Sequence, residues 1–233
     1  GPSYRSRSQS VTQIIQEFLP VSLQLGVAAM VLALLIALPL GGLAALRRGT
    51  WLDWTIVSLT TLGISLPSYV VASVGIVVLG VKLGWVPTIG WDGLFTPSSI
   101  VPIIGLSLAP LAALTRYFRA SMIEELHRDY VRTARAKGLS EQKVVGGHMA
   151  RNALIPVITV AGVYFSYVLM GSFFVETIAG VPGLGRYFVI SVAARDYPVI
   201  IGTTLLYAAV VLVVNILVDV SYAALDPRIH YDA

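Results

Sequence analysis

Residues Ser121–Asn152 read SMIEELHRDYVRTARAKGLSEQKVVGGHMARN, and this stretch decides how the rest of the chain folds. It carries ten charged side chains, whereas the segments on both sides of it are long and apolar. Charged side chains at membrane depth are costly. We therefore predict that Ser121–Asn152 folds outside the bilayer, as a polar loop between two membrane-spanning helices.

The composition of the whole chain supports a membrane protein. Of its 233 residues, 56% are hydrophobic and only 12% are charged, whereas soluble domains carry about 25% charged residues. These values predict an all-α, polytopic helical bundle in a lipid bilayer. The chain has no cysteine, which excludes disulfides, zinc–thiolate sites and thiol nucleophiles. The net charge of +4 is explained below by membrane topology, so we expect no nucleic-acid partner.

Five apolar segments are long enough to cross the bilayer, which takes about 20 helical residues. The second has Pro67 at its middle, and the third has Pro102 in its first turn and Pro110 at mid-span. A short amphipathic helix over 11–18 is expected to lie at the interface, and 187–194 is expected to form a short interfacial or re-entrant helix. The five expected spans cover residues 21–46, 55–81, 100–117, 153–175 and 198–222.

The distribution of Lys and Arg sets the orientation. Eleven of the sixteen basic residues fall on the side of the 121–152 loop and five on the other, and the basic side faces the cytoplasm. The chain then divides into an external or interfacial lead-in (1–20), a transmembrane domain (21–222) containing the cytoplasmic loop, and a cytoplasmic tail (223–233). Five spans place the N-terminus outside. Because no signal peptide precedes the first span, we expect a further N-terminal span, and an external segment, ahead of this sequence.

No motif in the chain supplies chemistry or energy. It lacks the phosphate-binding G-x-x-x-x-G-K-[ST] loop, HExxH and G-x-S-x-G. The three histidines, His127, His148 and His230, lack metal-ligand spacing. We expect neither catalytic residues nor a metal site. Ionisable residues are nearly absent from the span interiors, which disfavours ion coupling. Glu176 is interpreted as a solvated interfacial carboxylate, and Asn215 as a polar contact between helices.

A bundle without its own energy source must receive energy from another protein. The 121–152 loop is the candidate site at which that protein docks. Apolar residues at spacings of three and four predict one helix from Met122 to Ala136. Gly138 is expected to end it in a C-terminal cap, and Ser140 to begin a second short helix that reaches His148 or Met149. The alternative is a basic loop that only obeys the positive-inside rule. The predicted docking surface consists of small and apolar residues: Ala134, Ala136, Gly138, Leu139 and Val144.

Two segments of this region resemble a known family. YVRTARAKGLS (Tyr130–Ser140) and RNALIPV (Arg151–Val157) are similar to the coupling loop of ABC importer permeases. The general importer motif is E-A-A-x-x-x-G, nine further residues and I-x-L-P. Ala134 and Gly138 match it. The departures, Arg132, Thr133 and Arg151, are usual in the B-type permease subunit of dipeptide and oligopeptide importers.

The resemblance continues along nearly the whole chain. LPVSLQLG, SLPSYV, VETIAGVPGLGRYF, RDYPVI and LDPRI occur in the same order as in that subunit. In the family, a first span and an external segment precede the GPS stretch that opens this sequence. That agrees with the extra span expected from the distribution of basic residues and the odd number of spans.

The resemblance implies a type I ABC importer permease in the bacterial cytoplasmic (inner) membrane. Such a subunit pairs with a paralogous permease and receives peptides from an extracytoplasmic binding protein. Its coupling helix, here around 138–145, docks on cytoplasmic ATPase subunits, which bind ATP and Mg; the permease binds no cofactor. The implied coupling residues are Ala134, Arg135, Lys137, Gly138, Leu139, Ser140 and Glu141.

The resemblance also suggests an outer gate or binding-protein contact at ETIAGVPGLG and the residue after it, with Glu176, Gly183 and Arg186 as candidates. A structural turn is the alternative there. For the whole protein, two alternatives stay open. One is an ABC importer permease for nickel or glutathione, and the other is a stand-alone channel or secondary transporter.

Overall fold

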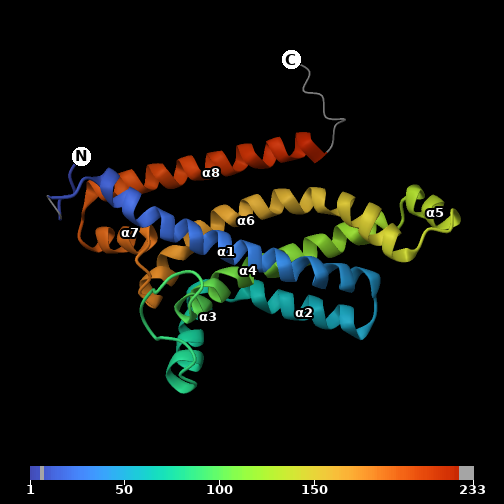
Figure 1. The fold of residues 1–233 in the computed structure, drawn as a ribbon, viewed down its shortest axis with the longest axis horizontal. Coiled ribbons are helices and arrows are strands. Elements are labelled where there is room, and N and C mark those ends of the chain that lie inside the picture. The colour runs from blue at the N-terminus through green and yellow to red at the C-terminus, as the bar shows by residue number, and fades with distance from the viewer. Residues whose placement is uncertain (6–7, 226–233) are drawn as a thin grey trace, which may run out of the picture.

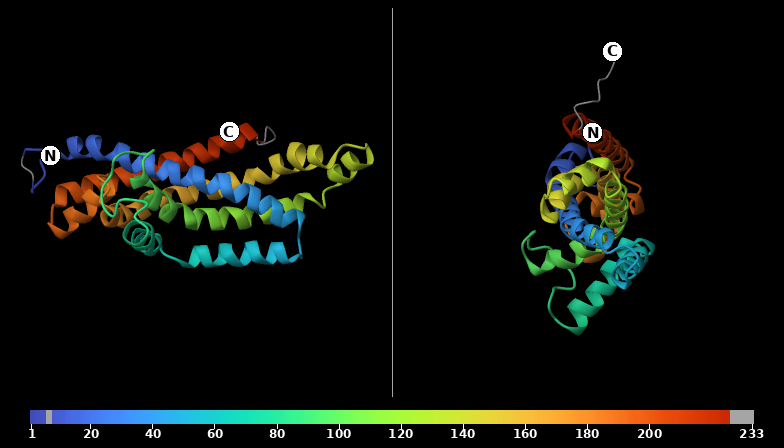
Figure 2. Two further views of the ribbon diagram at one scale, coloured as in Figure 1. Left: turned by 60° about the horizontal axis from the view of Figure 1, so that its bottom comes forward. Right: turned by 90° about the vertical axis from the view of Figure 1, so that its right-hand side faces the viewer.

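The computed structural model describes residues 1–5 and 8–225, and its regular elements within those ranges are helices, apart from one isolated bridge between Pro2 and Ser10. Four long helices, α1, α4, α6 and α8, run side by side along the longest axis of the molecule (Figures 1 and 2). The expectation of an all-α bundle is confirmed. Residues 226–233, most of the expected cytoplasmic tail, lie outside the described residues.

The first helix, α1 (Val11–Leu46), is continuous over 36 residues. Ser10 and Gln13 form a capping box at its start. The expected separate interfacial helix over 11–18 is therefore wrong: it is the first part of α1. Val11 and Ile14 are buried in a cluster with residues of α6, α7 and α8, so packing against protein keeps this part helical. At about 1.5 Å per residue α1 is about 54 Å long, well beyond the bilayer core of about 30 Å.

The second expected span is broken. α2 (Trp51–Ser65) and the following helices, α3 (Ser68–Gly75) and the π-helical η1 (Ile76–Lys82), meet at a bend of 97°. Pro67 explains the break, because a proline pushes the residue before it out of the helical region, and Leu66 is extended with ψ 120°. Figure 1 shows α3 turning away from the long axis of the bundle.

The third span, α4 (Pro97–Glu125), is longer at both ends than expected. Pro97 takes the first helical position, where a missing N–H costs nothing, so Pro102 falls in the second turn rather than the first. The C-terminal end of α4 extends to Glu125. α5 (Asp129–Ala136) then begins after an extended Arg128. The single helix expected from Met122 to Ala136 is therefore two helices.

The chain returns through η2 (Lys143–Met149), a π-helical segment that continues directly into α6 (Ala150–Ala179). The second short helix expected from Ser140 is thus the beginning of a longer one. After a tight turn come α7 (Leu184–Ala193) and α8 (Tyr197–Leu225). Helices α6 and α7 meet at 87°, and the expected short interfacial or re-entrant helix is α7.

Length and composition give four helices that could cross a membrane among the described residues, or up to six if each bent pair is one span. The broken pair 51–82 supplies the remaining expected span. Small residues let α1 lie close to α4: a Cβ added to Gly41 would come within 2.7 Å of the Thr115 carbonyl oxygen. The N-terminus and α7 lie at one end of the bundle and α5 at the other (Figure 1).

Candidate functional site

The polar end of the bundle is built around a glycine cap. Gly138 ends α5 with φ +75°, in the left-handed region that glycine adopts without strain. Its N–H donates to the Arg135 carbonyl at 2.9 Å, and the Leu139 N–H donates to the Ala134 carbonyl at 3.3 Å. The expected C-terminal cap is confirmed. A Cβ at Gly138 would have no atom within 4 Å, so the surface at this point is open.

The inner side of this loop is apolar and closed. Val131 and Val144 are fully buried, and Ala134 is 9% exposed. The expected docking surface is therefore wrong at Ala134 and Val144, because these two side chains hold the loop against the bundle. The residues that do face outward form a continuous exposed rim, Arg135, Ala136, Lys137, Gly138, Leu139, Ser140 and Glu141.

An ion pair closes the exposed rim. The Arg135 guanidinium donates to both carboxylate oxygens of Glu141, at 2.5 and 3.2 Å, across the Gly138 turn. This hydrogen bond and the positive charge hold the pKa of Glu141 below its ordinary value. Arg135 is one of the coupling residues that the resemblance implies. In this chain it already has an acidic partner, so its first effect is to hold the turn in one shape.

Tyr130 links the loop to two long helices, a role that its sequence position did not suggest. Its hydroxyl donates to the Glu125 carboxylate at the end of α4 and accepts a hydrogen bond from the Asn152 amide, in the first turn of α6, at 3.2 Å. Burial and the neighbouring Glu125 raise the pKa of Tyr130, so the hydroxyl stays protonated. Tyr130 thus connects α5 to both α4 and α6 through hydrogen bonds.

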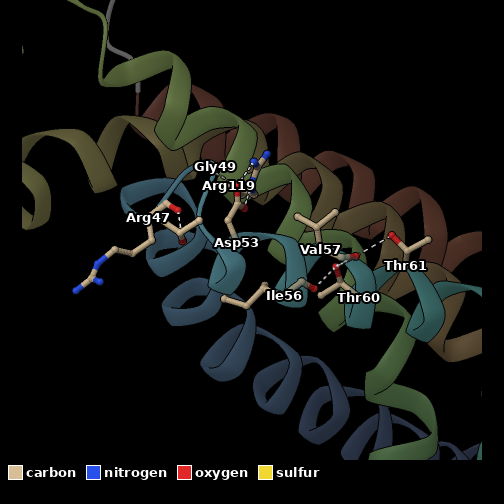
Figure 3. A network of polar contacts seen from close by, with 9 residues as sticks. Arg47, Gly49, Asp53, Ile56, Val57, Thr60, Thr61 and Arg119 are labelled. Atoms are coloured by element: carbon tan, nitrogen blue, oxygen red, sulfur yellow. Dashed lines mark hydrogen bonds and ion pairs between the residues drawn. The ribbon is translucent and has the colours of Figure 1, made fainter.

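A second missed contact lies near the same end (Figure 3). Arg119 of α4 forms a two-pronged ion pair with Asp53 in the first turn of α2, with N–O distances of 2.6 and 2.7 Å. The Gly49 N–H also donates to Asp53 at 3.0 Å. Sequence reasoning used Arg119 only as a topological charge, because nothing local indicates a partner 66 residues away.

At the opposite end, Glu176 is fully buried, so its interpretation as a solvated interfacial carboxylate is wrong. One carboxylate oxygen accepts the Arg186 backbone N–H at 3.0 Å, and the Ser22 hydroxyl accepts the Leu184 N–H at 2.9 Å. Both N–H groups belong to the first turn of α7, whose free donors and dipole attract oxygen. A glutamate from α6 and a serine from α1 thus cap α7.

The three candidate gate residues come together in this turn. A Cβ on Gly183 would lie 2.7 Å from the Ser22 hydroxyl, so only glycine fits there. The Arg186 guanidinium donates to the Gly180 carbonyl at 3.2 Å. Glu176 has no exposed surface for a partner in this conformation. Its contribution to any gate is to position α7.

The N-terminal segment is attached to the same end through Asp196, between α7 and α8. The Asp196 carboxylate accepts hydrogen bonds from the Ser3 hydroxyl and from the backbone N–H groups of Tyr4 and Arg5, at 3.1 and 3.2 Å for the latter two. Burial raises the pKa of this carboxyl, but these hydrogen bonds outweigh burial and hold it below its ordinary value. In the described parts of the chain, no three His, Asp or Glu side chains are grouped to hold a metal ion.

Apolar helices long enough to cross a membrane, bent helix pairs, an exposed polar loop at one end and a capped turn at the other are the architecture of a polytopic membrane protein. Residues 37–231 match the family described as binding-protein-dependent transport system inner membrane component. The chain belongs to this family. It is the permease component of an ABC importer and lies in the inner membrane.

Named relatives agree with this assignment, and a solved structure shows a similar fold. The chain is 44% identical over 229 residues to the dipeptide transport system permease protein DppB of Bacillus subtilis, covering 98% of this chain and 74% of the relative. It is 39% identical over 231 residues to the oligopeptide transport system permease protein OppB of Escherichia coli K12, covering 99% and 76%. The fold resembles a chain of the MetNI methionine ABC transporter in inward-facing conformations, with a TM-score of 0.73, 16% identity, and coverage of 92% and 97%.

Proposed function

We propose that this chain is the permease subunit of an ATP-driven importer of di- or oligopeptides, and that it is coupled to its ATPase through the exposed rim at Gly138. The rim is the observation that supports this most directly. It projects from the end of the bundle that carries most of the basic residues, and its shape is fixed by the Gly138 cap and the Arg135–Glu141 pair. The peptide substrate is inferred from the names of the DppB and OppB relatives.

The proposed assembly has three kinds of partner. A paralogous permease completes the translocation path within the bilayer. Cytoplasmic ATPase subunits dock on the rim and carry the ATP and Mg, so this chain catalyses no reaction and binds no cofactor. An extracytoplasmic binding protein delivers the peptide at the end where α7 and the N-terminus lie.

Gly138→Asp tests the coupling role, because it adds a charged side chain where the surface is open. It leaves the buried side chains of the loop, Val131, Ala134 and Val144, unchanged. Gly49→Asp is the matched control. Gly49 lies in the exposed α1–α2 turn near the same end, also has a positive φ, of 78°, and also has no atom within 4 Å of a built Cβ. In proteoliposomes of the full complex, we expect Gly138→Asp to abolish peptide uptake and peptide-stimulated ATP hydrolysis, and Gly49→Asp to keep both.

Normal uptake by Gly138→Asp would overturn the coupling role. Stimulation of the ATPase by nickel or glutathione, but not by peptides, would reassign the substrate. Uptake without any ATPase subunit would favour the stand-alone transporter.

A further inference from the structure

We propose that the exposed face formed by the α2–α3 break, the middle of α4 and the neighbouring part of α6 lines the water-filled path along which the peptide crosses the membrane. This inference rests on the proposed function for the identity of the substrate. It assigns the path to named residues, beginning with Ser65 and Tyr167.

The broken backbone is the first observation. Ser65, Leu66 and Pro67 are all exposed on the surface of the chain. The break lies 15 residues along α2 from Trp51, which is about 22 Å and falls within a hydrocarbon core of about 30 Å. Lipid cannot form hydrogen bonds with free backbone groups, so a non-helical segment at this depth must be covered by protein or line water.

The side chains around the break are the second observation. Tyr69 is 45% exposed and Tyr167 62% exposed, and each carries a hydroxyl that lipid would leave unsatisfied. The opposite surface, on α8, is different in kind. Between residues 201 and 220 its large exposed side chains are apolar, as a lipid-facing surface requires: Ile201, Leu205, Leu212, Ile216, Leu217 and Val220. Thr204 and Asn215 are exposed there as well, so Asn215 is not packed between helices of this chain. Tyr197, which is also exposed, is the first residue of α8.

This face is hollowed beside the α2–α3 break. Two hollows of about 300 and 160 Å³ adjoin there. They share Ile64, Ala109 and Tyr167 as walls, and Ser65 and Ser68 line the smaller one. Hollows of this size can hold water beside the Ser65 and Tyr167 side chains.

The chemistry of the walls suits a peptide main chain. The residues lining the two hollows are uncharged, and the polar groups among them are tyrosine and serine hydroxyls and the backbone at the break. Hydroxyls both donate and accept hydrogen bonds, so they can serve the N–H and C=O groups of an extended peptide. Because no charge lines the hollows, the path does not select peptides by side-chain charge.

The absence of cysteine from the chain makes accessibility directly measurable. Ser65→Cys and Tyr167→Cys place a thiol on the proposed path. Leu205→Cys, on α8 and about 12 Å from the start of that helix, places an equally exposed thiol on the lipid-facing side. Each variant is assembled with the partner permease, ATPase and binding protein, and labelling of this chain by a membrane-impermeant cationic thiosulfonate is followed by mass spectrometry, with and without ATP and a tripeptide.

We expect Ser65→Cys and Tyr167→Cys to label at least about tenfold faster than Leu205→Cys, because the reagent attacks a water-exposed thiolate. We also expect the tripeptide with its binding protein to slow labelling at these two positions. Ser68→Cys serves as the second path position if Tyr167→Cys does not assemble.

Protection of a labelled thiol by peptide during turnover would support the path. Failure of all path positions to label in any nucleotide state would show that the second permease covers this face, and would overturn the inference. Labelling that is unchanged while peptide stimulates the ATPase would show that the peptide passes elsewhere. If peptide does not stimulate the ATPase at all, the proposed function itself fails, and labelling still reports whether the face is wet.

Discussion

The ion pair between Asp53 and Arg119 should be a major link between α2 and the bundle, and Asp53→Ala is the perturbation that tests it (Figure 3). The Asp53 side chain is 4% exposed and that of Arg119 25%. Removing one partner of a buried ion pair costs about 3–5 kcal/mol, because the other charge stays buried. Arg119 is a quarter exposed and can be solvated in part. We therefore expect Asp53→Ala to lower the free energy of unfolding by an amount near the lower end of this range, about 3 kcal/mol.

Arg119→Ala should lower the free energy of unfolding more than Asp53→Ala does. It leaves the Asp53 carboxylate, the more deeply buried of the two charges, with only the Gly49 N–H as a hydrogen-bond partner. The double variant should be less destabilised than the sum of the two, by about 2 kcal/mol. Arg47→Ala is the control. Arg47 is an exposed cation in the same α1–α2 turn, and its loss should change the free energy of unfolding by less than about 0.5 kcal/mol.

Trp51 and Trp54 flank Asp53 in sequence and provide the signal. Their fluorescence, followed through reversible denaturation in mixed micelles, gives the free energy of unfolding for each variant. Additivity of the two single substitutions would refute the reasoning, since it would mean that the two side chains do not interact in the folded protein.

Three further predictions concern the two ends of the bundle. Tyr130→Phe should leave ATPase binding intact but lower the number of peptides imported per ATP hydrolysed, because α5 loses its hydrogen bonds to α4 and α6; an unchanged ratio would exclude this link. Gly183→Ala should lower the thermal stability of the detergent-purified complex, since the added methyl would lie 2.7 Å from the Ser22 hydroxyl, and an unchanged melting temperature would contradict that packing. The pKa of Asp196 is depressed, so its stabilising contacts are fully present above its ordinary pKa of 3.8 and are lost as the pH falls through its lower folded value. Asp196→Asn should therefore lower the stability of the protein at neutral pH, and lower it less in acid. Equal losses of stability at both pH values would contradict this.

Much of the fold could be predicted from the sequence because membrane helices can be recognised from their local composition. Long apolar runs gave the spans, and the excess of arginine on one side predicts a cytoplasmic position for the loop. Gly138 gave the helix end, since a glycine after an amphipathic run is the usual left-handed cap.

What could not be predicted depends on contacts between distant segments. The apolar stripe continues from Ile123 and Leu126 to Val131, which all pack in the same core cluster, and so it concealed the break between α4 and α5. Pro67 was placed at the middle of a span, but a proline alone does not predict a bend of 97°. Glu176 looked solvated because its partner, the first turn of α7, is brought to it only by the folded turn. Asp53 likewise gave no local sign of Arg119.

The central claim is that the rim at Gly138 meets the ATPase, and the most direct measurement is site-specific cross-linking from Leu139, an exposed rim residue. Because the chain has no cysteine of its own, Leu139→Cys gives it a single thiol for a short bifunctional reagent, with Arg47→Cys as the matched position outside the rim. The account predicts a cross-link from Leu139→Cys to the ATPase subunit, with loss of peptide-stimulated ATP hydrolysis once it forms, and little from Arg47→Cys. Failure of Leu139→Cys to cross-link in an assembled, active complex, or equal cross-linking from both positions, would contradict it.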